Sequence, residues 1–200
     1  MMLNDFTRVF KVTSKNQHDI GSDIYTNVPS ELYQLFDVFG GCTFNYGLYR
    51  IHSFSSSIHW SLRIGEYFPG YVNKVYPFGF DWMGRQFSID RTRELIFMFD
   101  PATMEDFVLH KTINTFHNED LSNNLLSSEL FNSILTFNKI AELDDESCFG
   151  YDIPLFLGGK DDLENYQRQD MEVYWDITNQ LYNKIKDLPK GTKIGKITLE

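Results

Sequence analysis

The chain has 200 residues and a mass of 23.5 kDa, which suffices for one domain or for two small halves that share a surface. Apolar residues make up 42% of the chain and aromatic residues 16%, so the sequence can build a sizeable core and a disordered protein is excluded. With 18 basic and 28 acidic residues the formal net charge is -10, which disfavours direct binding to nucleic acid or to an anionic membrane and favours a basic partner.

The first half of the chain predicts a helix followed by strands. The helix begins near Pro29 and ends at Gly40-Gly41, because apolar residues between them recur at helical spacing. Residues 44–52 are rich in Tyr and Phe and predict a strand. Residues 55–68 fit either a strand or a helix, and we predict a helix because Pro69-Gly70 would stop it. An antiparallel meander of short strands is predicted after it, at residues 74–78, 85–90, 94–99 and 106–112.

From about residue 116 the pattern favours helices. One is expected to begin near Ser127, and an acidic loop at 142–146 and an apolar strand at 149–157 follow it. The last helix, 171–188, has a continuous apolar stripe and Asp170 as its expected N-cap. The fold class predicted is therefore α+β, with an antiparallel sheet, helices packed on one face and a helical C-terminal part. We expect residues 1–115 and 116–200 to form two parts or one compact unit.

Motifs for catalysis are incomplete. Gly158-Gly159-Lys160 looks like a phosphate loop, but Asp161 follows where Ser or Thr is needed, and a tight turn explains the glycines better. The sequence has no G-x-S-x-G elbow, and Cys42 has no activating base close to it in sequence. We therefore predict no catalytic residue and no cofactor.

One group of possible metal ligands is dense, namely His110, His117, Glu119 and Asp120. Its spacing matches no known metal motif, so a polar joint before the next helix is the favoured interpretation and no metal is predicted. A metal-dependent hydrolase centred on the last three of these residues stays open as an alternative. A second alternative is a regulatory module that binds a small molecule through the aromatic-rich N-terminal half.

Two cysteines, Cys42 and Cys148, could close one disulfide, but they lack the spacing of a metal site. No signal peptide is recognisable and no apolar run approaches the length needed to cross a bilayer, so we expect a cytoplasmic protein with free thiols.

Negative charge is concentrated in the second half of the chain, where 9 cations face 18 anions. Two acidic blocks flank the predicted strand at 149–157, and such a rim could steer a basic partner such as a nuclease. Ordinary solvation of two loops is the alternative. The predicted partner-binding residues are Asp144, Asp145, Glu146, Asp161, Asp162 and Glu164.

The C-terminal half resembles a known bacterial family. Residues 149–159 (FGYDIPLFLGG), Glu164-Asn165 and residues 170–175 (DMEVYW) are similar to the C-terminal domain of antidote proteins to type VI secretion DNase toxins. Upstream, residues 76–79, 81–87 and 116–119 are similar to the part of these proteins called GAD-like. The resemblance extends from about residue 29 to residue 194.

The resemblance implies a non-catalytic cytoplasmic immunity protein that binds a cognate effector toxin and neutralises it in a stoichiometric complex. It supplies no catalytic residues and does not identify the toxin. Residues of the shared motifs are expected to hold the fold: Trp82, Gly84, Gly158, Gly159, Asp170, Met171 and Tyr174.

Overall fold

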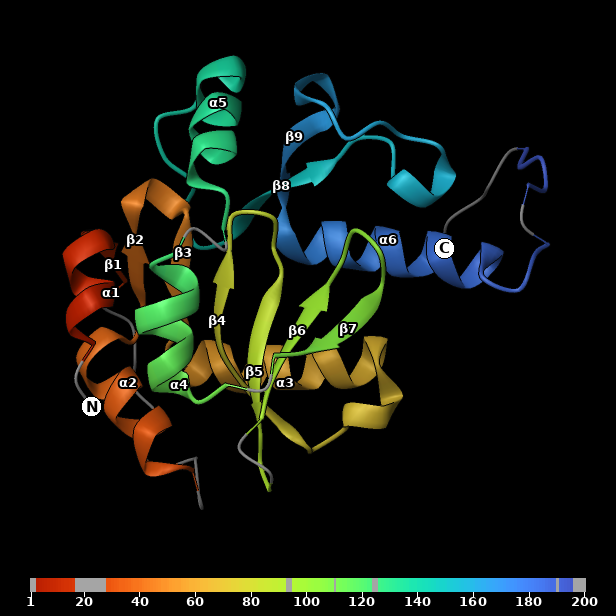
Figure 1. The fold of residues 1–200 in the computed structure, drawn as a ribbon. Coiled ribbons are helices and arrows are strands. Elements are labelled where there is room, and N and C mark those ends of the chain that lie inside the picture. Colours follow the sequence, from red (N-terminus) through yellow and green to blue (C-terminus); the bar gives the residue numbers. More distant parts are fainter. Residues whose placement is uncertain are drawn as a thin grey trace.

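The computed structural model describes residues 3–16, 28–92, 95–109, 111–123, 126–189 and 191–195. Its central element is a seven-stranded antiparallel sheet in which the strands follow one another in chain order (Figure 1). The strands are β1 (Val12–Lys15), β2 (Cys42–Phe44), β3 (Tyr49–Ile51), β4 (Val75–Asp81), β5 (Gln86–Asp90), β6 (Ile96–Asp100) and β7 (Glu105–Val108). The antiparallel meander predicted from the sequence is thus confirmed.

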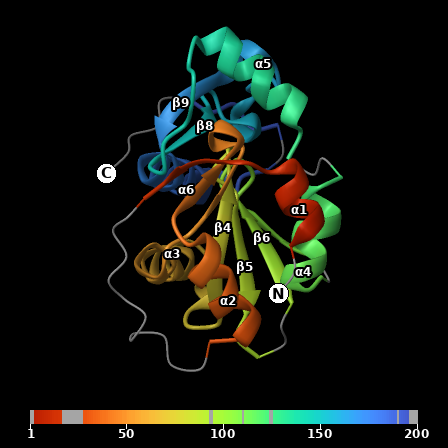
Figure 2. The same ribbon diagram turned by 90° about the vertical axis from the view of Figure 1, so that its left-hand side faces the viewer.

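Helices cover both faces of this sheet. They are α1 (Asn4–Val9), α2 (Ser30–Phe39), α3 (Phe54–Tyr67) and the short α4 (Ile113–Thr115), which continues as a π-helical turn over Phe116–Leu121. Figure 2 shows α3 on one side of β4 and β5, and α1 with α4 on the other. The α+β class is confirmed, but the expectation of helices on one face is wrong. Every residue of β4 and β5 is buried, so each face of these strands needs a cover.

Alternating side chains of the sheet enter two separate hydrophobic clusters. Phe78 and Phe87 pack with residues of α1 and α2 and with Phe116 of the Phe116–Leu121 turn. Phe80 and Phe99 pack in the other cluster, with α3 and the last helix. In a regular strand Phe78 and Phe80, two residues apart, would share a face, but the register of β4 with β5 shifts between Pro77 and Gly79 and turns them to opposite faces.

Residues 44–52 form a hairpin and not the single predicted strand. Asn45 and Tyr46 have positive φ values of 48° and 61°, and this left-handed turn joins β2 to β3. The helix expected at 55–68 is confirmed as α3, which the Ser53 side chain caps by accepting from the Ser56 amide at 3.1 Å.

The C-terminal part adds α5 (Ser128–Asn138), a two-stranded hairpin of β8 (Ser147–Tyr151) and β9 (Tyr166–Asp170), and α6 (Met171–Ile185). The strand expected at 149–157 ends at Tyr151, and a 3-10 turn at Leu155–Leu157 follows Pro154. Strand β9 has no counterpart in the sequence prediction. Asp170 caps α6, as predicted, by accepting from the Val173 amide at 2.9 Å.

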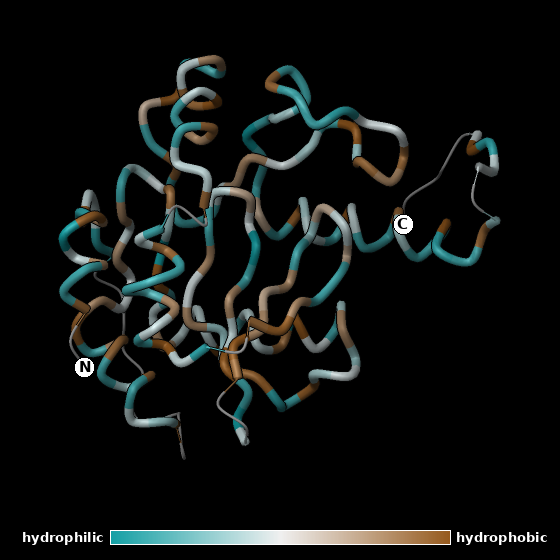
Figure 3. Tube along the Cα trace, in the orientation of Figure 1, coloured by the Kyte–Doolittle hydropathy of each residue, from teal (hydrophilic) through white to brown (hydrophobic). Residues whose placement is uncertain are grey.

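The two parts of the chain share buried contacts. The Trp82 indole donates to the Leu126 carbonyl at 2.7 Å, and the Trp175 indole donates to the Gly84 carbonyl at 2.9 Å. A division between residues 115 and 116 stays a prediction. Figure 3 shows hydrophilic residues along much of α6, whereas the connection from β8 to β9 mixes hydrophobic and hydrophilic residues.

Cys42 and Cys148 are both buried and free. Within the described ranges, the structure has no helix with the length and apolar character that a membrane span requires.

Candidate partner-binding site

The first acidic block is anchored to the sheet and to β9. Asp144 pairs with Arg168 at 2.5 Å between guanidinium and carboxylate. Partial burial acts to raise the pKa of Asp144, but a hydrogen bond from Ser147 and the charge of Arg168 outweigh it and leave the pKa below its ordinary value. Asp145 accepts from the Asn16 amide at 2.6 Å, whereas the Glu146 carboxylate has no ion pair with any described residue. Glu146 is therefore the most available charge of this block.

Arg50 fixes the position of this acidic loop from within β3. Its guanidinium donates to the carbonyls of Asp144, Ser147 and Asp81, the last two at 2.7 and 2.8 Å. The guanidinium also lies 4.5 Å from the centre of the Phe80 ring. Burial lowers the pKa of Arg50 to about 10, so the side chain remains a cation at neutral pH.

The second acidic block lies at the other end of the β8–β9 hairpin. Ser147 pairs with Asp170 at one end of the hairpin and Tyr151 with Tyr166 at the other. Asp161 accepts from the hydroxyls of both tyrosines, at 3.0 and 2.7 Å. Asp162 and Glu164 are exposed beside it. The structure therefore does not bring the two predicted blocks together in one site.

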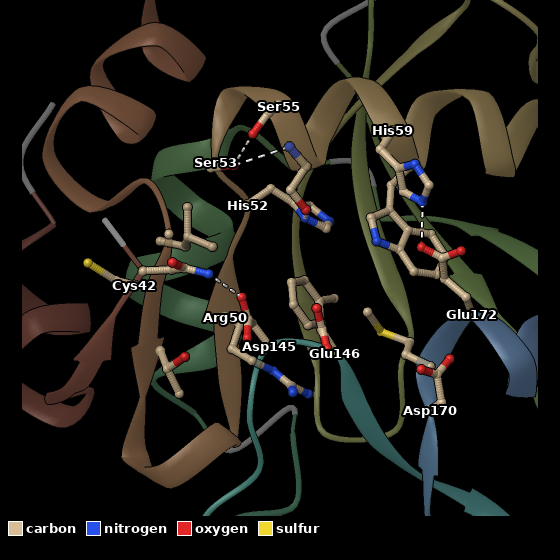
Figure 4. A pocket seen from close by; sticks show the side chains of 18 of the residues that line it. Cys42, Arg50, His52, Ser53, Ser55, His59, Asp145, Glu146, Asp170 and Glu172 are labelled. Carbon is tan, nitrogen blue, oxygen red and sulfur yellow. Dashed lines mark hydrogen bonds and ion pairs between the residues drawn. The ribbon is translucent and has the colours of Figure 1, made fainter. Parts of the chain in front are cut away.

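The first block instead borders a cavity of about 740 Å³ between the sheet and the start of α6. Its lining includes the carboxylates of Asp145, Glu146, Asp170, Glu172 and Asp176. In Figure 4, Arg50 and His52 lie on one side of the cavity, Asp170 and Glu172 lie on the other, and Asp145 and Glu146 lie between them. Glu172 and Asp176 were not predicted as site residues, although their spacing of four in a helix places them on one face.

Several polar side chains of this cavity are already engaged within the protein. Glu172 pairs with His59 of α3 at 2.6 Å. Asp176 accepts from Arg63 and from the Tyr67 hydroxyl, at 2.5 and 2.8 Å. These bridges hold α6 against α3 and fix the shape of the cavity.

His52, at the wall of the cavity, is neutral at pH 7. Burial lowers its pKa to about 3. The ring contacts Ser56 Oγ and Gln86 Oε1, each at 2.8 Å, so Nε2 donates to the glutamine and Nδ1 accepts from the serine. A base this weak makes the Ser56 hydroxyl a structural partner and not an activated nucleophile.

The residues of the alternative metal site are not assembled. His117 is fully buried in the aromatic core, where its ring contacts the Tyr49 hydroxyl at 3.1 Å and the Ile113 carbonyl at 2.7 Å. Glu119 and Asp120 lie near Lys111, with 3.5 Å from its Nζ to each carboxylate. His110 lies outside the described residues. Across those that are described, no three possible ligands gather to hold a metal ion.

Several motif residues make packing or main-chain contacts. Tyr174 lies against Gly150, where an added Cβ would be 2.5 Å from its ring, and its hydroxyl accepts from the Tyr151 amide at 3.3 Å. The Met171 amide donates to the Glu146 carbonyl at 2.8 Å. Gly84 adopts a φ of 77° in the turn between β4 and β5. A structural role for the motif residues stays a prediction.

Gly158 and Gly159 differ in the space available for a side chain, so alanine substitutions at the two positions should differ in their effect on stability. A Cβ at Gly159 would be 1.8 Å from the Ile153 carbonyl oxygen, whereas Gly158 has a φ of 92° with open space around it. We expect Gly159→Ala to cost more than about 2 kcal/mol in the free energy of unfolding, because backbone must move. Gly158→Ala should cost ~1 kcal/mol, from φ strain alone. Urea unfolding of both variants measures this, and equal costs would contradict it.

Comparison with known proteins adds a family and a fold. Residues 105–182 match the family described as "T6SS immunity protein Tdi1, C-terminal", where T6SS denotes the type VI secretion system. No curated protein matches the chain. A solved structure, "Crystal structure of Atu4351 from Agrobacterium tumefaciens", aligns with a TM-score of 0.65 over 90% of this chain and 89% of that one. At 12% sequence identity, this alignment establishes similarity of fold alone.

The matched segment contains all five carboxylates of the cavity, whereas Arg50, His52 and His59 precede it. The family found here agrees with the resemblance seen in the motifs of the C-terminal half. Residues 105–182 thus match the C-terminal domain family of the T6SS immunity protein Tdi1.

Proposed function

We propose that this chain is a cytoplasmic immunity protein that binds a basic nuclease toxin and neutralises it by forming a stoichiometric complex, without catalysis. The observation that carries the proposal is the match to the Tdi1 C-terminal family, because an immunity protein of the T6SS implies a cognate effector toxin. The acidic second half of the chain supports a nuclease as that effector. A nuclease needs a cationic groove to hold phosphates, and an acidic surface complements such a groove. The proposal includes no direct contact with nucleic acid or membrane.

Capture of the partner tests this function. The full chain is expressed in its native host, isolated at moderate salt, and its bound proteins are identified by mass spectrometry. We expect one protein, encoded by a neighbouring gene, at equal stoichiometry, and we expect its DNA cleavage to stop at one equivalent of the chain. If a host that expresses the neighbouring gene yields no such complex, the proposal fails.

Charge at the two acidic blocks is expected to speed the association. We propose that both blocks belong to the binding surface, so Asp145→Asn with Glu146→Gln, and separately Asp162→Asn with Glu164→Gln, should each lower the association rate with the captured effector. The expected fall is about fivefold at low salt, with a flatter dependence on ionic strength, because steering by charge is screened.

Glu31→Gln with Asp37→Asn is the matched control, since it removes two charges from the exposed face of α2. Stopped-flow measurements over a range of salt concentrations separate the variants. A block whose loss leaves the rate and its salt dependence at the control value is solvated surface and not part of the interface.

A further inference from the structure

The cavity at the start of α6 has the size and the walls of a binding site. Its volume of about 740 Å³ lies within the range of roughly 300–1,000 Å³ that is usual for ligand pockets. Trp60, Phe80 and Met171 contribute apolar groups to the lining, and carboxylates and hydroxyls supply the polar ones. Such a lining suits a side chain with an apolar stem and a polar end.

The charge of the cavity favours a cation. Five carboxylates line it, against the guanidinium of Arg50 and two imidazoles: His52, which is neutral, and His59, which pairs with Glu172. These carboxylates are dispersed over the loop 144–146 and the first two turns of α6, and within the described chain no group of three converges as metal ligands. A wide, planar cation with several donors matches dispersed acceptors better than a metal ion does.

Arg50 adds an unused donor to the same wall. The side chain is 1% exposed, and its Nε has no hydrogen-bond partner among the described residues, although both terminal nitrogens are engaged. A buried N–H without an acceptor is costly, so an oxygen brought by a ligand would be favourable there. A residue of a polypeptide offers both groups, a cationic side chain and a main-chain carbonyl oxygen.

We propose, on the basis of the toxin-binding function above, that this cavity receives an arginine from an extended segment of the effector. The guanidinium of that arginine contacts two exposed carboxylates, Glu146 of the acidic loop and Glu172 of α6, the second of which also pairs with His59. Its stem packs toward Trp60 and Met171. Its main-chain carbonyl supplies the acceptor for Arg50. The effector is thus held at a cavity built from both parts of the chain, and the first acidic block, which borders the cavity, guides it there.

A blocked amino acid tests the cavity without the effector. N-acetyl-arginine amide is titrated into the full chain labelled with ¹⁵N, and N-acetyl-citrulline amide serves as the neutral isostere. We expect the arginine probe to shift the Trp60 indole N–H signal and the citrulline probe to leave it in place. Equal shifts from both probes, or shifts that avoid Trp60, would overturn the proposal.

Two charge-matched double variants make the test specific. Glu146→Gln with Glu172→Gln should weaken binding of the arginine probe by at least about tenfold, since close charge pairs contribute this much or more at interfaces. Glu31→Gln with Glu129→Gln is the control, because both residues lie, as Glu172 does, in the first turn of a helix but outside the cavity. Similar affinities of the two double variants for the arginine probe would refute the assignment.

The same variants, measured against the captured effector, distinguish failure of this inference from failure of the proposed function. If the wild-type chain binds the effector and both double variants bind it equally well, the cavity is not the contact while the immunity function stands. If the arginine probe binds as expected but no effector is captured, the cavity is an arginine site and the toxin-binding function fails.

Discussion

Replacing Arg50 with methionine is expected to lower the free energy of unfolding by about 3–5 kcal/mol, the usual cost of deleting one partner from a buried charged network. The substitution keeps much of the volume but leaves the carbonyls of Asp81, Asp144 and Ser147 without their donor. Each of these carbonyls loses a charge-assisted bond in a site that water does not reach freely. The loss in the free energy of unfolding should therefore be much larger than the loss caused by removing a surface ion pair.

Arg168→Met is the comparison that isolates burial, because Arg168 contacts the same acidic loop through a half-exposed ion pair with Asp144. Its expected cost is at most ~1 kcal/mol. Arg50→Lys keeps the charge but cannot donate to several carbonyls in the planar geometry of a guanidinium. Its cost in the free energy of unfolding should therefore lie between those of Arg50→Met and Arg168→Met. Urea unfolding curves give the three values, and an Arg50→Met variant as stable as Arg168→Met would show that the network is not important for stability.

Loss of Arg50 should also disturb the cavity, since the loop at 144–146 is tied to β3 through this side chain. The arginine probe described above is then expected to bind the Arg50→Met variant more weakly than the wild-type chain. The loss would arise from position and not from charge, because removing a cation should otherwise favour a cationic ligand.

Elements with strong local signals were predictable from the sequence. The limits of α2 follow from Pro29 and Gly40-Gly41, and the cap of α6 follows from Asp170. These features act within one or two turns, so periodicity and end signals suffice to place them. The hairpin of β2 and β3 escaped prediction because its turn uses Asn45 and Tyr46 at positive φ within a run of aromatic residues, where β propensity dominates.

The cavity could be predicted only in part, because its walls come from distant positions in the chain. The acidic loop was recognisable as a charge block, and Asp145 and Glu146 do line the cavity. Glu172 was not selected because an acidic residue in the first turn of a helix is ordinary. Arg50 had one local signal, its place between Tyr49 and Ile51 in an apolar strand. An arginine is rarely buried without partners, so this place indicates a buried charge that other segments must satisfy. The register of β8 with β9 brings the acidic loop before β8 next to the start of α6 after β9.

Stability should fall as the pH drops below about 6.5, because His52 and His117 are buried as neutral rings. Burial lowers the pKa of His52 to about 3 and that of His117 to about 4. The unfolded chain takes up protons near pH 6.5, the ordinary value for histidine, whereas the folded chain does not. Below that pH the unfolded state binds more protons than the folded state, so the free energy of unfolding decreases with falling pH until the folded pKa values are reached.

The expected loss from these two rings between pH 7 and pH 5 is about 3–4 kcal/mol in total, since each contributes up to ~1.4 kcal/mol per pH unit. His117→Gln and His52→Gln should each remove about half of the slope. Unfolding by urea at intervals of half a pH unit measures the slopes of the three chains. A free energy of unfolding that stays constant from pH 7 to pH 5 would mean that the two rings exchange protons in the folded protein, and the packing around Tyr49 and Phe80 would then have to admit water.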